Sequence, residues 1–135
     1  MRLHEDAIIP EYKSAGAAGF DLHALHGFVL GPHESIAIRT GLAFEIPEGF
    51  EMSIRGRSGI AFNDNVWGFN GTIDSDYRGE VKVLLHNMSG MYKEYKLGDR
   101  IAQAVVSPVA VLPINEAYEL SETDRGTSGF GSTGK

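Results

Sequence analysis

The sequence predicts a single all-β domain with the jelly-roll form of a β-barrel or sandwich. Apolar and polar residues alternate with a period of two along several short stretches, and glycines and prolines separate these stretches at short intervals. No segment carries a long apolar repeat with helical period, although Ser58–Asn63 is compatible with one or two helical turns. Many short strands within one domain are typical of a sandwich or barrel.

The length and composition fit one globular domain. A chain of 135 residues can bury a substantial core, and 42% hydrophobic with 22% charged residues is ordinary for a globular protein. No apolar run approaches the roughly 18 residues of a membrane-spanning helix. The start, Met1–Asp6, is acidic where a signal peptide would begin its hydrophobic region. We therefore expect a cytoplasmic location and no membrane partner.

The charge and the lack of cysteine exclude several classes of function. Without cysteine the chain has no disulfide, no thiol nucleophile and no thiolate zinc site, including that of the zinc-dependent deaminases. A net charge of -6 argues against nucleic acid as a general partner. A small anion can still bind where a few arginines and a metal ion gather locally.

In chain order, the first strands are expected in the N-terminal half. Ala18–Leu22 is a small strand-like segment, and a second strand is expected around Ile36–Ile38. Leu42–Ile46 and Phe50–Ile54 each alternate, so they are predicted to form a hairpin that turns at Pro47–Gly49 and buries one face.

Further strands are expected in the C-terminal half. Val81–Leu85 alternates and is followed by a turn at Met88–Gly90. Ile101–Val106 and Val109–Ile114 are apolar runs that Ser107–Pro108 separates, and both are predicted to be buried strands.

The end of the chain differs in composition from the rest. Apolar residues nearly disappear from residue 116, so we predict a β domain over residues 1–115 and a flexible glycine-rich arm over 116–135. Within the arm, glycine amides, Ser132, Thr133 and Arg125 can surround phosphate oxygens, and Phe130 can stack on a flat ring. A flexible tail and a lid that orders on a ligand both fit this composition.

Residues 71–80 concentrate polar chemistry between two glycines. Acids, a tyrosine and an arginine lie between Gly71 and Gly79, which are predicted turn or bulge positions of a hairpin arm that leads into the next strand. Asp74 follows Ile73, whose side chain is expected to anchor the opposite face. A tight turn with solvated acids fits the same residues.

Two shorter segments also admit two interpretations. Arg57–Gly59 follows a predicted strand and can form an anion site at a helix start, or an ordinary helix cap. Asp99–Arg100 can form a salt bridge in a turn, with Gln103 half exposed beyond it.

His23 and His26 fall on opposite faces of an extended segment, so they are interpreted as surface histidines rather than metal ligands.

Five segments, taken in order, resemble the motifs of the homotrimeric dUTPase family: Ala18–Leu22, Arg57–Gly59, Gly71–Glu80, Arg100–Gln103 and Arg125–Gly134. The resemblance spans nearly the whole chain. It implies a jelly-roll subunit and a homotrimer with three active sites, each lined by all three chains. It also implies Mg²⁺-dependent hydrolysis of dUTP to dUMP and pyrophosphate, which limits uracil in DNA and supplies dUMP for thymidylate synthesis.

The resemblance assigns roles to individual residues. Asp74 matches the acid that activates the attacking water, and Tyr77 matches the tyrosine beneath deoxyribose that leaves no room for a 2′-hydroxyl. Asp21 matches an acid that holds Mg²⁺ through water. The other matched positions bind uracil or the phosphates: Arg57, Ser58, Gly59, Asn70, Gly71, Thr72, Ile73, Gln103, Arg125, Phe130, Gly131, Ser132 and Thr133.

Four positions depart from the family pattern. The family usually has an asparagine six residues before the catalytic acid and a proline four before it, where this chain has Gly68 and Asn70. Whether Asn70 supplies the missing uracil contact is left open. Gly56 replaces a frequent proline, and Ser128 replaces a usual glycine of the arm.

Two other functions fit part of the pattern. A dCTP deaminase of the same superfamily would release ammonia from dCTP, but the spacing of Asp74 and Tyr77 favours dUTPase. A nucleotide-responsive interaction protein on this scaffold would use dUTP to order the arm rather than to turn over substrate.

Overall fold

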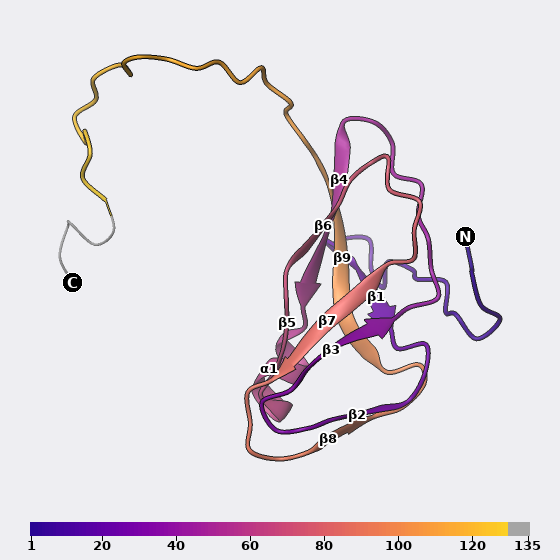
Figure 1. Ribbon diagram of the computed structural model, residues 1–135. Coiled ribbons are helices and arrows are strands. Elements are labelled where there is room, and N and C mark those ends of the chain that lie inside the picture. The colour runs from indigo at the N-terminus through magenta and orange to yellow at the C-terminus, as the bar shows by residue number, and fades with distance from the viewer. Residues whose placement is uncertain (130–135) are drawn as a thin grey trace.

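In the computed structural model, which describes residues 1–129, the strands pair into three antiparallel sheets (Figure 1). The largest has the order β1 (Phe20–His23), β9 (Arg100–Pro108), β4 (Phe50–Gly56), β6 (Gly71–Ile73). The second has the order β3 (Ser35–Arg39), β7 (Lys82–Asn87), β5 (Val66–Gly68). The third pairs β2 (Phe28–Leu30) with β8 (Lys93–Tyr95), and the helix α1 spans Ser58–Asp64. The predicted all-β class is confirmed.

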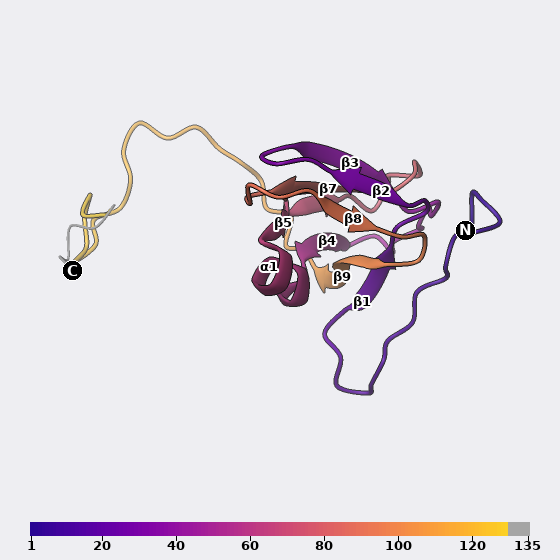
Figure 2. The ribbon, with the colours of Figure 1, turned by 90° about the horizontal axis from the view of Figure 1, so that it is seen from below.

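The core lies between the sheets, which stack as two layers (Figure 2). Met52 and Ile54 point inward from β4, and Val83 and Leu85 point inward from β7; all four are almost fully buried. Their neighbours along each strand are more exposed, as the period of two requires. This sandwich, consistent with a jelly roll, holds the functional segments on its edges.

The predicted hairpin between Leu42–Ile46 and Phe50–Ile54 is wrong. The turn at Pro47–Gly49 exists, because the amide of Phe50 donates to the carbonyl of Pro47 at 3.2 Å. However, residues 42–46 form only an isolated bridge, and β4 pairs with β9 and β6 instead. Alternation indicates one buried face, but it does not identify the strand that pairs with it.

The predicted strand at Val109–Ile114 is also wrong for the single chain. β9 ends at Pro108, and the following residues leave the sheets as an extended segment (Figure 1). Val111, Leu112 and Ile114 are 86%, 76% and 100% exposed. Among residues 1–129, little covers these three apolar side chains. The other predicted strands are confirmed, and Ser58–Asn63 lies within α1.

The C-terminal end of α1 is anchored to β8. Asp64 accepts a hydrogen bond from the hydroxyl of Tyr95 at 3.1 Å and pairs with Lys93 at 3.4 Å. The Tyr95 ring is buried and stacks on Phe28, with ring centroids 5.0 Å apart. Burial, and secondly the Asp64 carboxylate, raise the pKa of Tyr95 well above its ordinary value near 10.

This raised pKa gives a prediction for alkaline pH. The folded state favours protonated Tyr95, so stability is fully present below the unfolded pKa of about 10 and is lost as pH rises above it. An absorbance titration should show a tyrosinate component that appears only on unfolding. Tyr95→Phe should remove that component, and Tyr92→Phe, at an exposed ring, should leave it in place. The same component in Tyr95→Phe would contradict this.

Candidate functional site

The residues singled out in the sequence form two groups on β4 and its neighbours. The first group surrounds Asp21 on β1, which lies opposite Gln103 of β9. The side chain of Arg57, just beyond β4, donates to one oxygen of Asp21 at 3.0 Å, and Arg100 donates to the other at 3.3 Å. A second nitrogen of Arg57 donates to the carbonyl of Arg100 at 3.1 Å.

The Asp21 carboxylate is buried between these two arginines. The predicted pair between Asp99 and Arg100 does not form: Arg100 pairs with Asp21, and Asp99 accepts from the amide of Lys96 at 2.7 Å. Burying a carboxylate is costly unless it is paired, and here two arginines supply the pairing. Two guanidinium groups beside one carboxylate leave this group with a net positive charge, which is suited to phosphates.

His23 is not the surface residue that its spacing suggested. The strand β1 has a bulge between Leu22 and His23, where the register with β9 shifts. The side chain of His23 is therefore half-buried, and within the described residues its buried Nδ1 atom has no hydrogen-bond partner. Burial lowers the pKa of His23. His26 is exposed, as expected.

The second group lies in the turn after β6. Asp74 is exposed, and its carbonyl accepts from the amide of Tyr77 at 3.1 Å. Ile73 packs against the core, which confirms its predicted anchoring role. Gly71 is not a turn residue, since it begins β6 and pairs with Ile54 of β4. The turn is therefore held on β4 rather than in a hairpin of its own.

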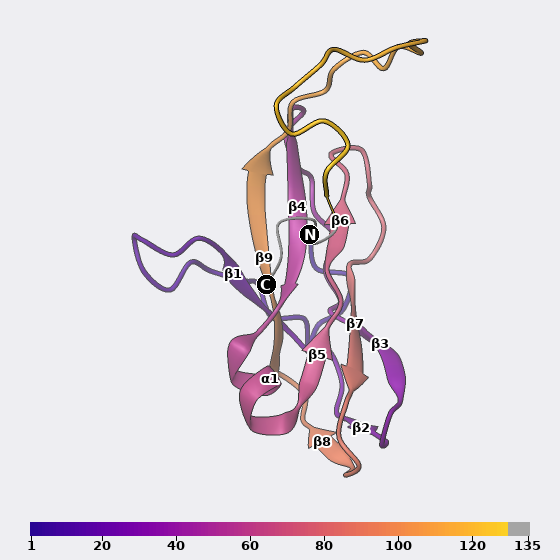
Figure 3. The ribbon, with the colours of Figure 1, turned by 90° about the vertical axis from the view of Figure 1, so that its left-hand side faces the viewer.

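The two groups are far apart within one chain. In the register of β4 and β6, Met52 lies opposite Ile73, which places Asp74 across from Glu51. Arg57 follows the end of β4, six residues beyond Glu51, and is therefore about 20 Å away at ~3.3 Å per residue. Figure 3 shows α1 at the far end of β4 from the turn after β6. One chain therefore cannot bring Asp74 and Arg57 to the same phosphorus atom.

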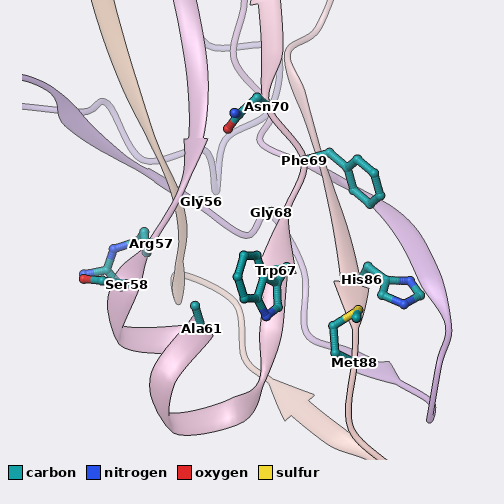
Figure 4. Close-up of a pocket in the computed structure, with 10 residues that line it drawn as sticks. All are labelled: Gly56, Arg57, Ser58, Ala61, Trp67, Gly68, Phe69, Asn70, His86 and Met88. Atoms are coloured by element: carbon teal, nitrogen blue, oxygen red, sulfur yellow. The ribbon is translucent and has the colours of Figure 1, made fainter. Parts of the chain in front are cut away.

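A hollow of about 660 Å³ lies beside the first group (Figure 4). Arg57 and Ser58 form one edge of it, Asn70 lies at another, and the aromatic side chains of Trp67 and Phe69 complete its wall. No side chain caps the start of α1, so the helix-cap interpretation of Arg57–Gly59 is not supported. The lining residues that sequence reasoning missed are Ala61, Phe69, His86 and Met88. Trp67 and Phe69, two exposed aromatic residues with one glycine between them, were the available signal.

Two departures from the family pattern meet in this hollow. Gly56 ends β4 and Gly68 ends β5, and their backbones are in close contact. A Cβ atom on Gly68 would lie 3.0 Å from the Cα of Gly56, and a Cβ on Gly56 would lie 3.2 Å from the amide nitrogen of Gly68. Each glycine therefore leaves the space that the backbone of the other occupies.

The arm is described only in part. The side chain of Arg125 donates to the carbonyl of Ser128 at 2.8 Å, within a local turn. The remaining predicted ligands of the arm, Phe130, Gly131, Ser132 and Thr133, lie outside the described residues.

A protein-family model described as dUTPase matches residues 5–134. The chain belongs to the dUTPase family. Curated relatives carry the name deoxyuridine 5′-triphosphate nucleotidohydrolase. One from Nautilia profundicola is 54% identical over 99% of this chain and 96% of that protein. One from a Picosynechococcus strain is 50% identical over the same shares.

Solved dUTPase structures share the fold. The dUTPase of Staphylococcus bacteriophage 80alpha with dUPNHPP has a TM-score of 0.90 and 28% identity, over 100% of this chain and 96% of that one. A mutant dUTPase from phage phi11 of S. aureus has a TM-score of 0.84 and 25% identity, over 88% and 95%. That structure is described as revealing the coordination of a structural Mg(II) ion. In this dUTPase, residues 1–129 contain no helix long and apolar enough to cross a membrane.

The contact between Gly56 and Gly68 predicts that the usual family residue fits at position 68 only if the backbone of Gly56 shifts. Gly68→Asn should destabilise the protein by about 1–3 kcal/mol, because the added Cβ meets backbone that has to move. The midpoint of urea unfolding measures this. Gly90→Ala is the matched control, since a Cβ there meets nothing within 4 Å. Equal midpoints for Gly68→Asn and the wild type would mean that the contact relaxes without cost.

Proposed function

We propose that this chain carries out the reaction of its family, the hydrolysis of dUTP to dUMP and pyrophosphate, at a site shared between copies. The site combines Asp74 of one copy with Arg57 and Ser58 of another. The observation that carries this proposal is the separation of about 20 Å between the two groups along β4. A single phosphorus atom needs both groups within a few ångströms, so each group has to meet the other on a neighbouring copy.

Asp74 is the proposed general base. Its exposed carboxylate can accept the proton of a water that attacks the α-phosphorus of dUTP. The turn is fixed from both sides, by the pairing of β6 with β4 and by the amide of Tyr77 on the carbonyl of Asp74. Because the main chain is fixed at Asp74, its carboxylate has less freedom to lose on the way to the transition state.

The backbone from Gly71 to Ile73 is proposed to bind uracil, together with Asn70 and Thr72. Fixed amide donors and carbonyl acceptors accept uracil and reject cytosine, whose exocyclic group has the opposite hydrogen-bonding pattern. Tyr77 is proposed to pack beneath the deoxyribose. Its hydroxyl donates to the carbonyl of Glu80 at 3.1 Å, which holds the ring across the turn.

The arginine cluster is proposed to bind the phosphates. Arg57, Ser58 and Gly59 lie at the start of α1, and Gln103 lies opposite Asp21 on the same sheet. Charge-assisted hydrogen bonds from a guanidinium to phosphate are strong and directional. The arm is proposed to close the site, with Phe130 over uracil and the other arm ligands on the β- and γ-phosphates: Arg125, Gly131, Ser132 and Thr133.

Mg²⁺ is the proposed cofactor, and Asp21 the residue that holds it through water. Residues 1–129 contain no cluster of three acidic or histidine side chains that could hold a metal directly. Each oxygen of Asp21 accepts from one arginine and keeps a second lone pair that can accept from a metal-bound water. This fits a hard cation that keeps several waters and otherwise binds substrate phosphates. When bound, the ion neutralises charge on the leaving pyrophosphate.

A homotrimer with shared active sites is the proposed assembly. Beside the separation along β4, the exposed apolar run from Val109 to Ile114 supports it, since such a run is normally covered. We propose that this run and the arm over residues 116–135 pack on a neighbouring copy. In a cytoplasmic setting, the enzyme would limit uracil in DNA and supply dUMP, with dUTP rather than nucleic acid as its partner.

Asp74→Asn should test the base. The variant should still bind a non-hydrolysable dUTP analogue and should lose about 10²–10⁴-fold in turnover, because the amide cannot accept the proton. Pyrophosphate release from dUTP, dCTP, dTTP and UTP with Mg²⁺ measures activity and specificity. Asp76→Asn, at an exposed acid of the same turn, is the control and should remain active. Turnover like the wild type in Asp74→Asn would rule out the assignment, and ammonia release from dCTP would indicate a deaminase.

Mixing two inactive variants should test the shared site. Asp74→Asn and Arg57→Gln each damage every site in a pure oligomer. In a co-refolded equal mixture, about a quarter of the sites should combine an intact Asp74 with an intact Arg57, and activity should return to about that fraction of the wild type. Gel filtration and circular dichroism verify that both variants fold and assemble. If assembled mixtures stay inactive, each site takes both residues from one chain.

A further inference from the structure

Glu80 connects the turn after β6 to the opposite sheet. Its carboxylate accepts from the side chain of Arg39 at 2.9 and 3.1 Å and from the amide of Gly41 at 2.9 Å. Arg39 ends β3, and Gly41 lies in the loop that follows it. The side chain of Glu80 is 14% exposed, whereas that of Arg39 is 50% exposed. Glu80 is therefore held by three hydrogen bonds to a segment about forty residues earlier in the chain.

The main chain of Glu80 holds Tyr77. Its carbonyl accepts from the Tyr77 hydroxyl at 3.1 Å. The ring lies across Gly79, because a Cβ atom there would collide with the hydroxyl end of the Tyr77 ring. One residue thus joins two contacts: its side chain binds the segment after β3, and its carbonyl fixes the end of the Tyr77 ring.

Apart from the contacts of Glu80 itself, the main chain next to it is hydrogen-bonded to the opposite sheet region on its C-terminal side, at Val81. The carbonyl of the next residue, Val81, accepts from the buried hydroxyl of Thr40 at 2.6 Å, and its amide donates to the carbonyl of Leu42 at 2.8 Å. On the other side, the hydrogen bonds of Arg78 within residues 1–129 go to carbonyls of its own turn, those of Ser75 and Tyr77. The Glu80 carboxylate is therefore the contact nearest to Tyr77 that ties this end of the turn to the segment after β3.

We propose that Glu80 is a positioning residue that sets the Tyr77 ring and thereby the discrimination between dUTP and UTP. The inference rests on the proposed role of Tyr77 beneath the deoxyribose. A ring fixed at its hydroxyl end keeps a defined position beneath the deoxyribose and excludes an added 2′-hydroxyl. A ring that is free to tilt excludes that hydroxyl less strongly. Loss of the Glu80 contacts should therefore reduce selectivity more than it reduces the hydrolysis of dUTP.

The ion pair with Arg39 contributes little to global stability, because a half-exposed arginine in water gains little from one carboxylate. The amide of Gly41 makes a charge-assisted bond to the same carboxylate, which is the stronger geometric constraint. Glu80→Gln keeps an oxygen acceptor for that amide and loses the charge. Glu80→Ala removes all three contacts of the side chain.

The test is the ratio of kcat/KM for dUTP to kcat/KM for UTP. Glu80→Ala should lower this ratio about tenfold, while Glu80→Gln should retain most of it. Glu94→Ala is the matched control, an exposed glutamate on β8, and should leave the ratio unchanged. A ratio like the wild type in an assembled Glu80→Ala variant would overturn the inference. If Glu80→Ala does not assemble, Glu80→Met replaces it, with the same expected loss, because methionine keeps the length of the side chain but has no oxygen acceptor for the amide of Gly41 or for Arg39.

Two Tyr77 variants separate the inference from the function on which it rests. Tyr77→Phe removes the hydroxyl that Glu80 holds, so its effect on the ratio should not add to that of Glu80→Ala in a double-mutant cycle. Additive effects would overturn the link between the two residues. Tyr77→Ala removes the ring and tests whether the ring excludes the 2′-hydroxyl. An unchanged ratio in Tyr77→Ala would refute the role of Tyr77, whereas a lower ratio there with no change in Glu80→Ala would refute only the role of Glu80.

Discussion

The pairing of β4 with β9 on one side and β6 on the other determines how this chain can work. These ladders fix Asp74 near the beginning of β4 and Arg57 just beyond its end. A paired strand is a stiff element of fixed rise, so thermal motion does not close a gap of about 20 Å. The proposed chemistry needs both residues at one phosphate, and this requirement makes association of copies part of the catalytic proposal. In the proposed assembly, the apolar run at Val109–Ile114, which is exposed in the single chain, packs on a neighbouring copy.

Electrostatics in the first group follow from the same sheet. Asp21 and Gln103 face each other on β1 and β9, and Arg57 and Arg100 converge on the Asp21 carboxylate. In the proposed site, the acid holds the two guanidinium groups in place before substrate binds, which would reduce the reorganisation that phosphate binding requires. A chain with a net charge of -6 thereby presents a local cationic edge. The protein can select a small, densely charged anion without attracting long polyanions.

The sequence predicted the fold class, most strands and the helix, because alternation and turn residues are local properties. It failed where the answer depends on partners distant in the chain. Leu42–Ile46 alternates like a strand yet forms only a bridge, since residues 100–108 take the place beside β4. His23 turned inward because a bulge broke the period of two. The site residues came from a resemblance in motif order, and no local pattern predicted that they would lie in two separate groups.

The glycines at positions 56 and 68 show how departures from a family pattern can be coupled. Each looks like an independent loss, of a proline in one motif and of an asparagine before the next. Their backbones touch, so a side chain at Gly68 would push against Gly56. The contact brings the end of β5 close to the start of α1, on the wall of the hollow that contains Arg57 and Asn70. Asn70, two residues beyond Gly68, carries the amide group of this segment that faces the hollow without such a clash. In the proposed site, Asn70, rather than a restored asparagine at position 68, is therefore the side chain of this segment that is available to contact uracil.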